Sequence, residues 1–263
     1  MKLTPIYKKF LLFSLPVLII VFTAQSVWAS SVSGFSIAPP PLGYASYYME
    51  ESPKRHRVDI SYLYYDFVDV SKVQGGSVYA NSRIIGGSWG SVSLQYGGFY
   101  LFGKDKGAYV IEDEFFNIIS IEDVDLNISG FNVVPTVEIA LYRSSIEAGQ
   151  GFMLTSFLGV DLGYQFFNQK FSDGKSSYHS RFAGLLAGIQ AHVPVWSTLV
   201  SPFFMVKHIR GQSVADDITS SFNFNVIGYG FDIVWHGFSL SGIMQAATKG
   251  KDKIYIVSIG FGF

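Results

Sequence analysis

The chain of 263 residues contains no cysteine. This absence excludes a fold stapled by disulfides and metal sites built on thiolate ligands. Charge is also scarce, because Asp, Glu, Lys and Arg together make up 15% of the residues. An ordinary soluble domain carries roughly 25%, since its whole surface faces water. The composition therefore favours a protein whose outer surface faces lipid.

Apolar runs long enough to form a transmembrane helix are missing after residue 29. The best candidate is the stretch 182–206, which has no Asp, Glu, Lys or Arg. Pro194 and Pro202 would break a helix there twice, whereas a hairpin of two strands accommodates the same residues. We therefore expect strands to cross the membrane.

The first 29 residues have the layout of a secretory signal peptide. Lysines at positions 2, 8 and 9 precede the apolar run 10–24, and the small-residue stretch Ser26 to Ala29 follows. The alternative is a membrane anchor, but a spanning helix needs roughly 20 apolar residues. No cysteine follows the cleavage site, which excludes a lipoprotein. Without its basic leader the chain is clearly acidic, so no nucleic-acid partner is expected.

Alternation of apolar with small or polar residues is the dominant pattern of the mature chain. Between residues 91 and 102, Val92, Leu94 and Tyr96 alternate with Ser91 and Ser93. The stretches 154–166 and 255–263 alternate in the same way. This is the pattern of a transmembrane barrel with lipid outside and small or polar side chains inside. The fold class predicted is an all-β, antiparallel up-and-down barrel.

The alternation and the turn signals predict about ten strands, with eight to twelve possible. They lie near 56–67, 77–88, 91–103, 126–142, 152–167, 179–193, 199–209, 221–235, 238–246 and 253–263. Short connections tend to alternate with longer ones, the longest being 104–125, as expected for periplasmic turns and outer loops. The domain prediction is a signal peptide at 1–29, an N-terminal extension or linker at 30–55, and a barrel at 56–263.

Tryptophan supports the assignment of the two ends. Trp89, Trp196 and Trp235 are the tryptophans after residue 29, and each lies at or beside a predicted short turn. Tryptophan favours the headgroup interface. These residues are therefore predicted to form the periplasmic half of an aromatic girdle.

The C-terminal strand resembles the assembly signal of bacterial outer-membrane β-barrel proteins. It closes on an aromatic residue, with aromatic or apolar residues at alternate positions before it: Tyr255, Val257, Ile259, Phe261 and Phe263. The resemblance implies location in the outer membrane, contact with its lipid and lipopolysaccharide, and insertion by the outer-membrane assembly machinery.

Titratable residues at inward positions form the candidate site. The alternation points six of them into the lumen: Asp59, Glu138, Asp161, His192, Lys207 and Asp232. Such groups must be hydrated or paired, and Asp161 and Lys207 are expected at similar heights. Barrels of eight strands are filled by side chains and aqueous channels appear near sixteen. The prediction is a plugged or very narrow lumen.

Several Ser, His and acidic residues are candidates for catalysis. His179 and Ser180 are neighbours, so on a strand their side chains point to opposite faces. Asp216 and Asp217, with His208 nearby, could activate water as the acidic pairs of an omptin-like protease do, although adjacent loop aspartates are usually solvated. The acidic residues between 112 and 125 lack the regular spacing of a cation-binding loop. No catalytic, metal or cofactor residue is assigned.

The function expected from the sequence is that of a small, non-enzymatic barrel with a structural or surface-interaction role. Two alternatives stay open: a narrow channel for small or apolar solutes, and an enzyme that cleaves lipid or peptide. An open polar path through the lumen would favour the channel, and a Ser–His or Asp–His cluster at one rim would favour the enzyme.

Cleavage after Ala29 is the first testable prediction. Mass spectrometry of the protein from outer-membrane fractions should find Ser30 at the N-terminus, because the basic, apolar and small-residue segments end there. Recovery of the protein with Met1 intact would contradict the prediction.

Overall fold

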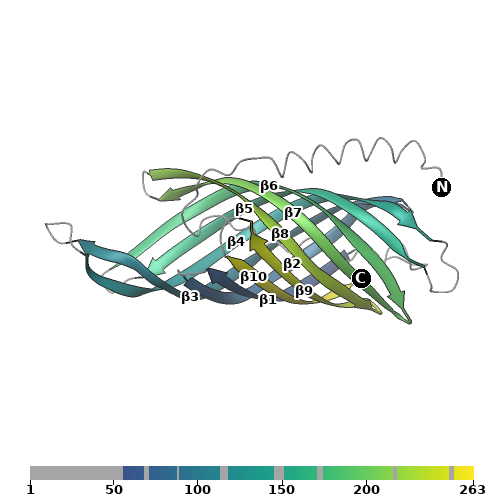
Figure 1. Cartoon of the computed structure of the whole chain (residues 1–263), viewed down its shortest axis with the longest axis horizontal. Coiled ribbons are helices and arrows are strands. Elements are labelled where there is room, and N and C mark those ends of the chain that lie inside the picture. Colours follow the sequence, from purple (N-terminus) through teal and green to yellow (C-terminus); the bar gives the residue numbers. More distant parts are fainter. Residues whose placement is uncertain are drawn as a thin grey trace.

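The computed structural model describes residues 56–67, 71–87, 89–112, 118–144, 151–170, 174–215, 218–248 and 252–263. In these segments ten strands form one closed antiparallel barrel, in which sequence neighbours pair and β1 pairs with β10 (Figure 1). The strands are β1 (His56–Phe67), β2 (Ser71–Gly87), β3 (Gly90–Glu112), β4 (Ile118–Arg143), β5 (Met153–Lys170), β6 (Lys175–Val195), β7 (Thr198–Ala215), β8 (Ile218–Trp235), β9 (Phe238–Ala247) and β10 (Lys253–Gly262). None of the described residues forms a helix able to cross a membrane. The predicted signal peptide and the 30–55 extension lie outside the described residues.

The predicted barrel with ten strands is confirmed, and its main error concerns strand length. The segment 104–125, expected to be the longest outer loop, is mostly a two-stranded ribbon. β3 continues to Glu112 and β4 begins at Ile118. Lys104 pairs with Asp125 and Asp105 with Val124, so the hydrogen-bonded ladder continues past the last alternating apolar residues. The sequence of this ribbon has no strict alternation, so the two strands could not be extended from the pattern.

The two ends of the barrel differ. His56 and Phe263 exchange backbone hydrogen bonds of 3.0 and 2.9 Å, so the first and last strands close the barrel at one end. The tight turns lie at this same end, including His236-Gly237, where both residues have positive φ as in a type I′ hairpin. We call it the turn end, and the opposite end the loop end.

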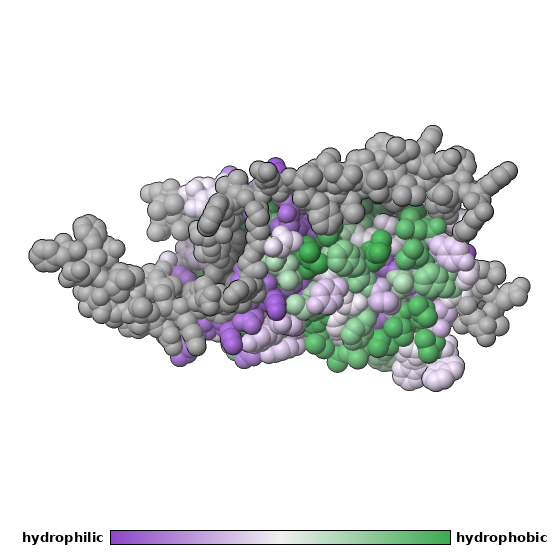
Figure 2. All heavy atoms as spheres, viewed as in Figure 1, coloured by the Kyte–Doolittle hydropathy of each residue, from purple (hydrophilic) through white to green (hydrophobic). Residues whose placement is uncertain are grey.

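The outer wall carries an apolar belt near the turn end. Every strand contributes to it at outward positions: Ile60, Val78, Tyr96, Phe131, Leu162, Leu185, Phe204, Phe231, Leu240 and Ile259, all at least one-third exposed. Figure 2 shows apolar residues gathered over the half nearer the C-terminus and polar residues toward the other end. Outward polar residues such as Asn168, Arg181 and Asn225 begin where the belt ends. The belt is what a lipid-facing surface requires.

The inward side chains of the lumen change from polar to apolar along the barrel. Near the turn end many inward side chains are polar, as in Ser91, Ser93 and Gln95 of β3, and a small apolar cluster lies there as well: Ala140, Met153, Leu199 and Val234. Farther along the same strand the inward positions hold Phe99 and Leu101, both buried in the main hydrophobic core. The expectation of small or polar residues throughout the lumen is therefore wrong for the loop half. The outward neighbours Tyr100 and Phe102 are 53% and 48% exposed, so the apolar core of the lumen begins at the level of the apolar belt.

Bulky inward side chains fit against glycines of neighbouring strands. A Cβ added at Gly163 would overlap the ring of Phe182, and one at Gly188 would overlap the ring of Phe157. These two glycines let an aromatic ring lie flat against the next strand. The lumen is thereby filled without spreading the strands apart.

Val160 gives a test of the register of β5. It lies at an outward position in the middle of the belt, next to the buried Asp161. Val160→Arg should lower the free energy of unfolding by roughly 2–4 kcal/mol, because it puts a charge near the bilayer midplane. Urea titration of the barrel in lipid bilayers measures this.

Asn168→Arg is the matched control on the same outward face of β5. Asn168 is exposed above the belt, so the substitution should cost about 0–1 kcal/mol. Equal costs at the two positions would show that the belt is wrongly placed.

Candidate functional site: polar clusters of the lumen

The structure places all six predicted lumen residues at inward positions. Asp59, Glu138, Asp161, His192, Lys207 and Asp232 are each at most 7% exposed. They do not form one site. They belong to three separate clusters. In each cluster, hydrogen bonds or ion pairs join inward side chains of different strands within the lumen.

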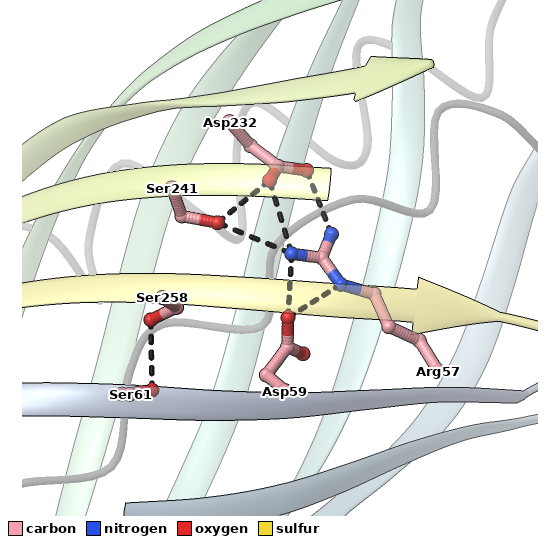
Figure 3. A network of polar contacts seen from close by, with 6 residues as sticks. All are labelled: Arg57, Asp59, Ser61, Asp232, Ser241 and Ser258. Carbon is pink, nitrogen blue, oxygen red and sulfur yellow. Dashed lines mark hydrogen bonds and ion pairs between the residues drawn. The ribbon is translucent and has the colours of Figure 1, made fainter. Parts of the chain in front are cut away.

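The first cluster is centred on Arg57, near the turn end (Figure 3). Its guanidinium donates to both carboxylate oxygens of Asp232, at 2.7 and 3.0 Å, and its Nε donates to Asp59 at 2.8 Å. Ser241 accepts a bond from Arg57 and donates one to Asp232 at 2.7 Å. The cluster links β1 to β8 over β10 and β9, so it spans the closing seam.

Sequence reasoning missed Arg57. It has the same parity as Asp59, two residues on, so the alternation already pointed it into the lumen. Arg57 lies at the start of the first strand, directly after the charged linker, so it was not distinguished from the linker's own charges. With Arg57 included, the cluster has one cation for two carboxylates and the pairing is bidentate on one side.

The second cluster crosses the middle of the lumen. Lys207 Nζ donates to Asp161 Oδ2 at 2.8 Å, and Asn132 Nδ2 donates to Asp161 Oδ1 at 2.8 Å. Tyr79 donates to Asn132 at 3.2 Å. The structure thus brings Asp161 and Lys207 together, and both are buried beside the apolar core. A charge in such surroundings depends on its partner.

The third cluster surrounds His192. Its Nδ1 lies 3.0 Å from Ser201 Oγ, and its Nε2 lies 3.0 Å from Thr155 Oγ1 and 3.7 Å from Glu138 Oε1. A Ser–His–acid set is the composition of a hydrolase triad. Here Ser201 and His192 are fully buried and Glu138 is 5% exposed. A nucleophile needs access to substrate, so this cluster fits a structural role better than a catalytic one.

The other catalytic candidates are also separated. Ser180 points into the lumen and lies 2.8 Å from Ser213, while His179 faces outward and stacks on Tyr164. His208 faces outward and contacts Asn225 at 2.7 Å. Asp216 and Asp217, and Asp113 and Glu114 of the acidic stretch, lie outside the described residues. In the part of the chain that the structure describes, no three His, Asp or Glu residues lie close enough to hold a metal ion.

The predicted girdle and assembly residues lie at the turn end and on β10. Trp89, Trp196 and Trp235 are 59%, 96% and 53% exposed beside the short turns. The outward face of β10 consists of the residues of the predicted assembly signal, Tyr255, Val257, Ile259 and Phe261, with Phe263 just beyond. Their roles in anchoring and assembly stay predictions.

Comparison with known proteins found similar barrels but no family. No family model matches the chain, and no curated protein matches it. Among solved structures, the outer-membrane protease OmpT from Escherichia coli matches with a TM-score of 0.47 and 9% identity, over 80% of this chain and 97% of that one. An outer-membrane channel from Pseudomonas putida F1 matches with a TM-score of 0.38 and 9% identity, over 87% and 100%. The attachment invasion locus protein Ail of Yersinia pestis matches with a TM-score of 0.32 and 8% identity, over 80% and 95%. At these identities no functional residue is transferred to this chain.

The Asp161–Lys207 pair should be strongly coupled. Lys207→Met removes one partner and leaves the other charge buried, which should cost about 3–5 kcal/mol of unfolding free energy. Lys207→Met combined with Asp161→Asn should cost much less than the sum of the two single changes, since no charge is then stranded. Urea titration of the four proteins gives the coupling. Simple additivity would show that water screens the pair.

Proposed function

We propose that the protein is an outer-membrane barrel with a closed lumen, which serves envelope structure or surface contact and neither conducts solutes nor catalyses a reaction. The observation that carries this proposal is the hydrophobic core inside the barrel.

That core includes buried side chains from all ten strands. Its members are Leu63 and Tyr65 of β1, Val73 and Tyr79 of β2, Phe99 and Leu101 of β3, Leu126, Ile128 and Val134 of β4, Phe157 and Phe167 of β5, Phe182 and Leu186 of β6, Phe203, Met205 and Ile209 of β7, Phe222 and Val226 of β8, Ile243 of β9, and Ile254 and Ile256 of β10. The least buried of them is 7% exposed. A path for polar solutes needs hydrated walls, and a packed apolar layer around the full circumference argues against such a path.

The size of the barrel agrees with a filled lumen. Side chains fill barrels of eight strands, and open aqueous channels appear at about sixteen. Ten strands lie near the filled limit. The charged groups of the Arg57 cluster near the turn end are paired with one another, so they act as packing.

The loop end has the features of a surface platform. β3 and β4 are the longest strands, with 23 and 26 residues, whereas a tilted strand crosses a bilayer in roughly 9–11. Figure 1 shows the ribbon that they form projecting farther than the rest of the loop end. A ribbon that projects past the other strands suits contact with partners outside the cell.

Conductance in planar lipid bilayers tests the proposal. The purified barrel should show no steady unitary currents, because the core blocks the lumen. A variant with Phe99, Phe157 and Phe182 changed to Ala should produce openings, which shows that the assay detects an unblocked lumen.

A matched control removes three rings from the outer wall. Changing Phe131, Phe166 and Phe204 to Ala deletes the same side-chain volume at exposed positions and should leave the barrel closed. Stable ohmic currents through the unaltered protein would overturn the proposal and favour the narrow channel.

A further inference from the structure

The outer wall of β5 to β8 carries positive charge without negative charge. In the described parts of these four strands, no outward position holds Asp or Glu. Lys170, Lys175, Arg181 and Arg210 are all exposed there, and His179 and His208 face the same side. Lys170 lies opposite Asp125 of β4, whereas the described outward positions of β6 to β8 hold no carboxylate beside the two arginines.

Two arginines lie at the centre of this surface. Arg181 pairs with Gln212 across β6 and β7, and Ala183 pairs with Arg210. The two arginines are therefore diagonal neighbours on one face, roughly 7–8 Å apart at the backbone. Like charges at this spacing repel each other, so an anion between them would be stabilising.

Neutral side chains hold both guanidinium groups in place. Arg181 Nη2 donates to Gln212 Oε1 at 2.9 Å, and Arg210 Nε donates to His208 Nε2 at 3.0 Å. His208 in turn contacts Asn225 through its Nδ1. Each arginine has five N–H donors, so most of them stay available. A guanidinium fixed in this way matches the oxygens of a phosphate group.

The arginines lie at the upper edge of the apolar belt. Ala183 and Leu185 follow Arg181 at outward positions of β6, and Phe204 lies below His208 on β7. Leu185 and Phe204 are 47% and 43% exposed. A ligand at this place would contact cations with one part and apolar surface with the part below it, which is the chemistry of a lipid.

The opposite wall has a different charge pattern at its edge. There Lys253 pairs with Asp66, Asp66 with Lys72, and Lys104 with Asp125, all at outward positions. Each of these lysines has a carboxylate directly opposite on a neighbouring strand. Lys72 also lies opposite Lys104, so this wall mixes both signs of charge, unlike the arginine surface of β6 and β7.

We propose that Arg181 and Arg210 bind the phosphorylated headgroup of an anionic glycolipid of the outer leaflet, with its acyl chains along Leu185 and Phe204. With the turn end in the periplasm, the edge of the belt on β6 and β7 lies at the level of the outer headgroups. The site goes beyond the closed-lumen function, because it lies on the outer wall and needs neither the lumen nor the loops.

Native mass spectrometry of the full mature barrel in non-ionic detergent tests the site. The probes are bis-phosphorylated lipid A, dephosphorylated lipid A and inorganic phosphate. The unaltered protein should retain bis-phosphorylated lipid A best. R181Q/R210Q should weaken this binding by about tenfold or more, since two charge-assisted contacts are lost.

Two further variants keep the test decisive. K72Q/K104Q removes the same charge from the opposite wall and should bind lipid A as the unaltered protein does. R181K/R210K keeps the charge without the bidentate geometry and should bind with intermediate strength. Heat-modifiable mobility on gels establishes that each variant is folded, and the lysine variant replaces the glutamine one if that one does not fold.

Three outcomes would overturn the proposal. Equal binding of lipid A by R181Q/R210Q and the unaltered protein would remove the site. Equal binding of dephosphorylated lipid A would remove the role of the phosphate. Displacement of lipid A by inorganic phosphate at the same concentration would mean a general anion site without lipid recognition.

Discussion

The closed ring of backbone hydrogen bonds is the constraint on which the rest of this structure depends. Within a bilayer, each unsatisfied N–H or C=O group costs several kcal/mol, so a sheet there must have no free edge. The ladder between β1 and β10, from Arg57 and Gly262 to Asp66 and Lys253, removes the last edge. Closure also fixes a period of two on every strand, so each residue faces either the lumen or the outside.

The two faces that this period creates have different compositions along the barrel. Lipid selects apolar residues on the outward face near the turn end, where Arg57, Asp232 and His192 lie in the lumen. The apolar core of the lumen begins within the belt, because Phe99 and Leu101 point inward while Tyr100 between them is exposed on the outer wall. The core continues toward the loop end, where outward residues such as Asn168 and Arg181 are polar.

The strength of the alternation on each strand explains what the sequence could and could not predict. The ten strands, their order and the outward faces of β3, β5 and β10 followed from alternation, because the belt selects one face strongly. The ribbon at 104–125 did not, since neither face of it is apolar throughout. The lumen core was missed because Phe99 continues the parity of Ser91 and Ser93 with opposite polarity. Asp161 and Lys207 were predictable as inward groups at similar heights, whereas Asn132 of the neighbouring β4 and Tyr79 of β2, which complete their cluster, were not.

Buried charge at the seam also bears on how the barrel reaches one register. A shift of one residue between β1 and β10 would turn Arg57 and Asp59 toward lipid, where a charged side chain is costly. A shift of two would keep them inside but move Arg57 away from Asp232, to which it donates two hydrogen bonds. Breaking a buried pair costs more than forming it gains. We therefore expect the Arg57 cluster to act mainly against wrong closures, with a contribution to the specificity of the fold that exceeds its contribution to stability.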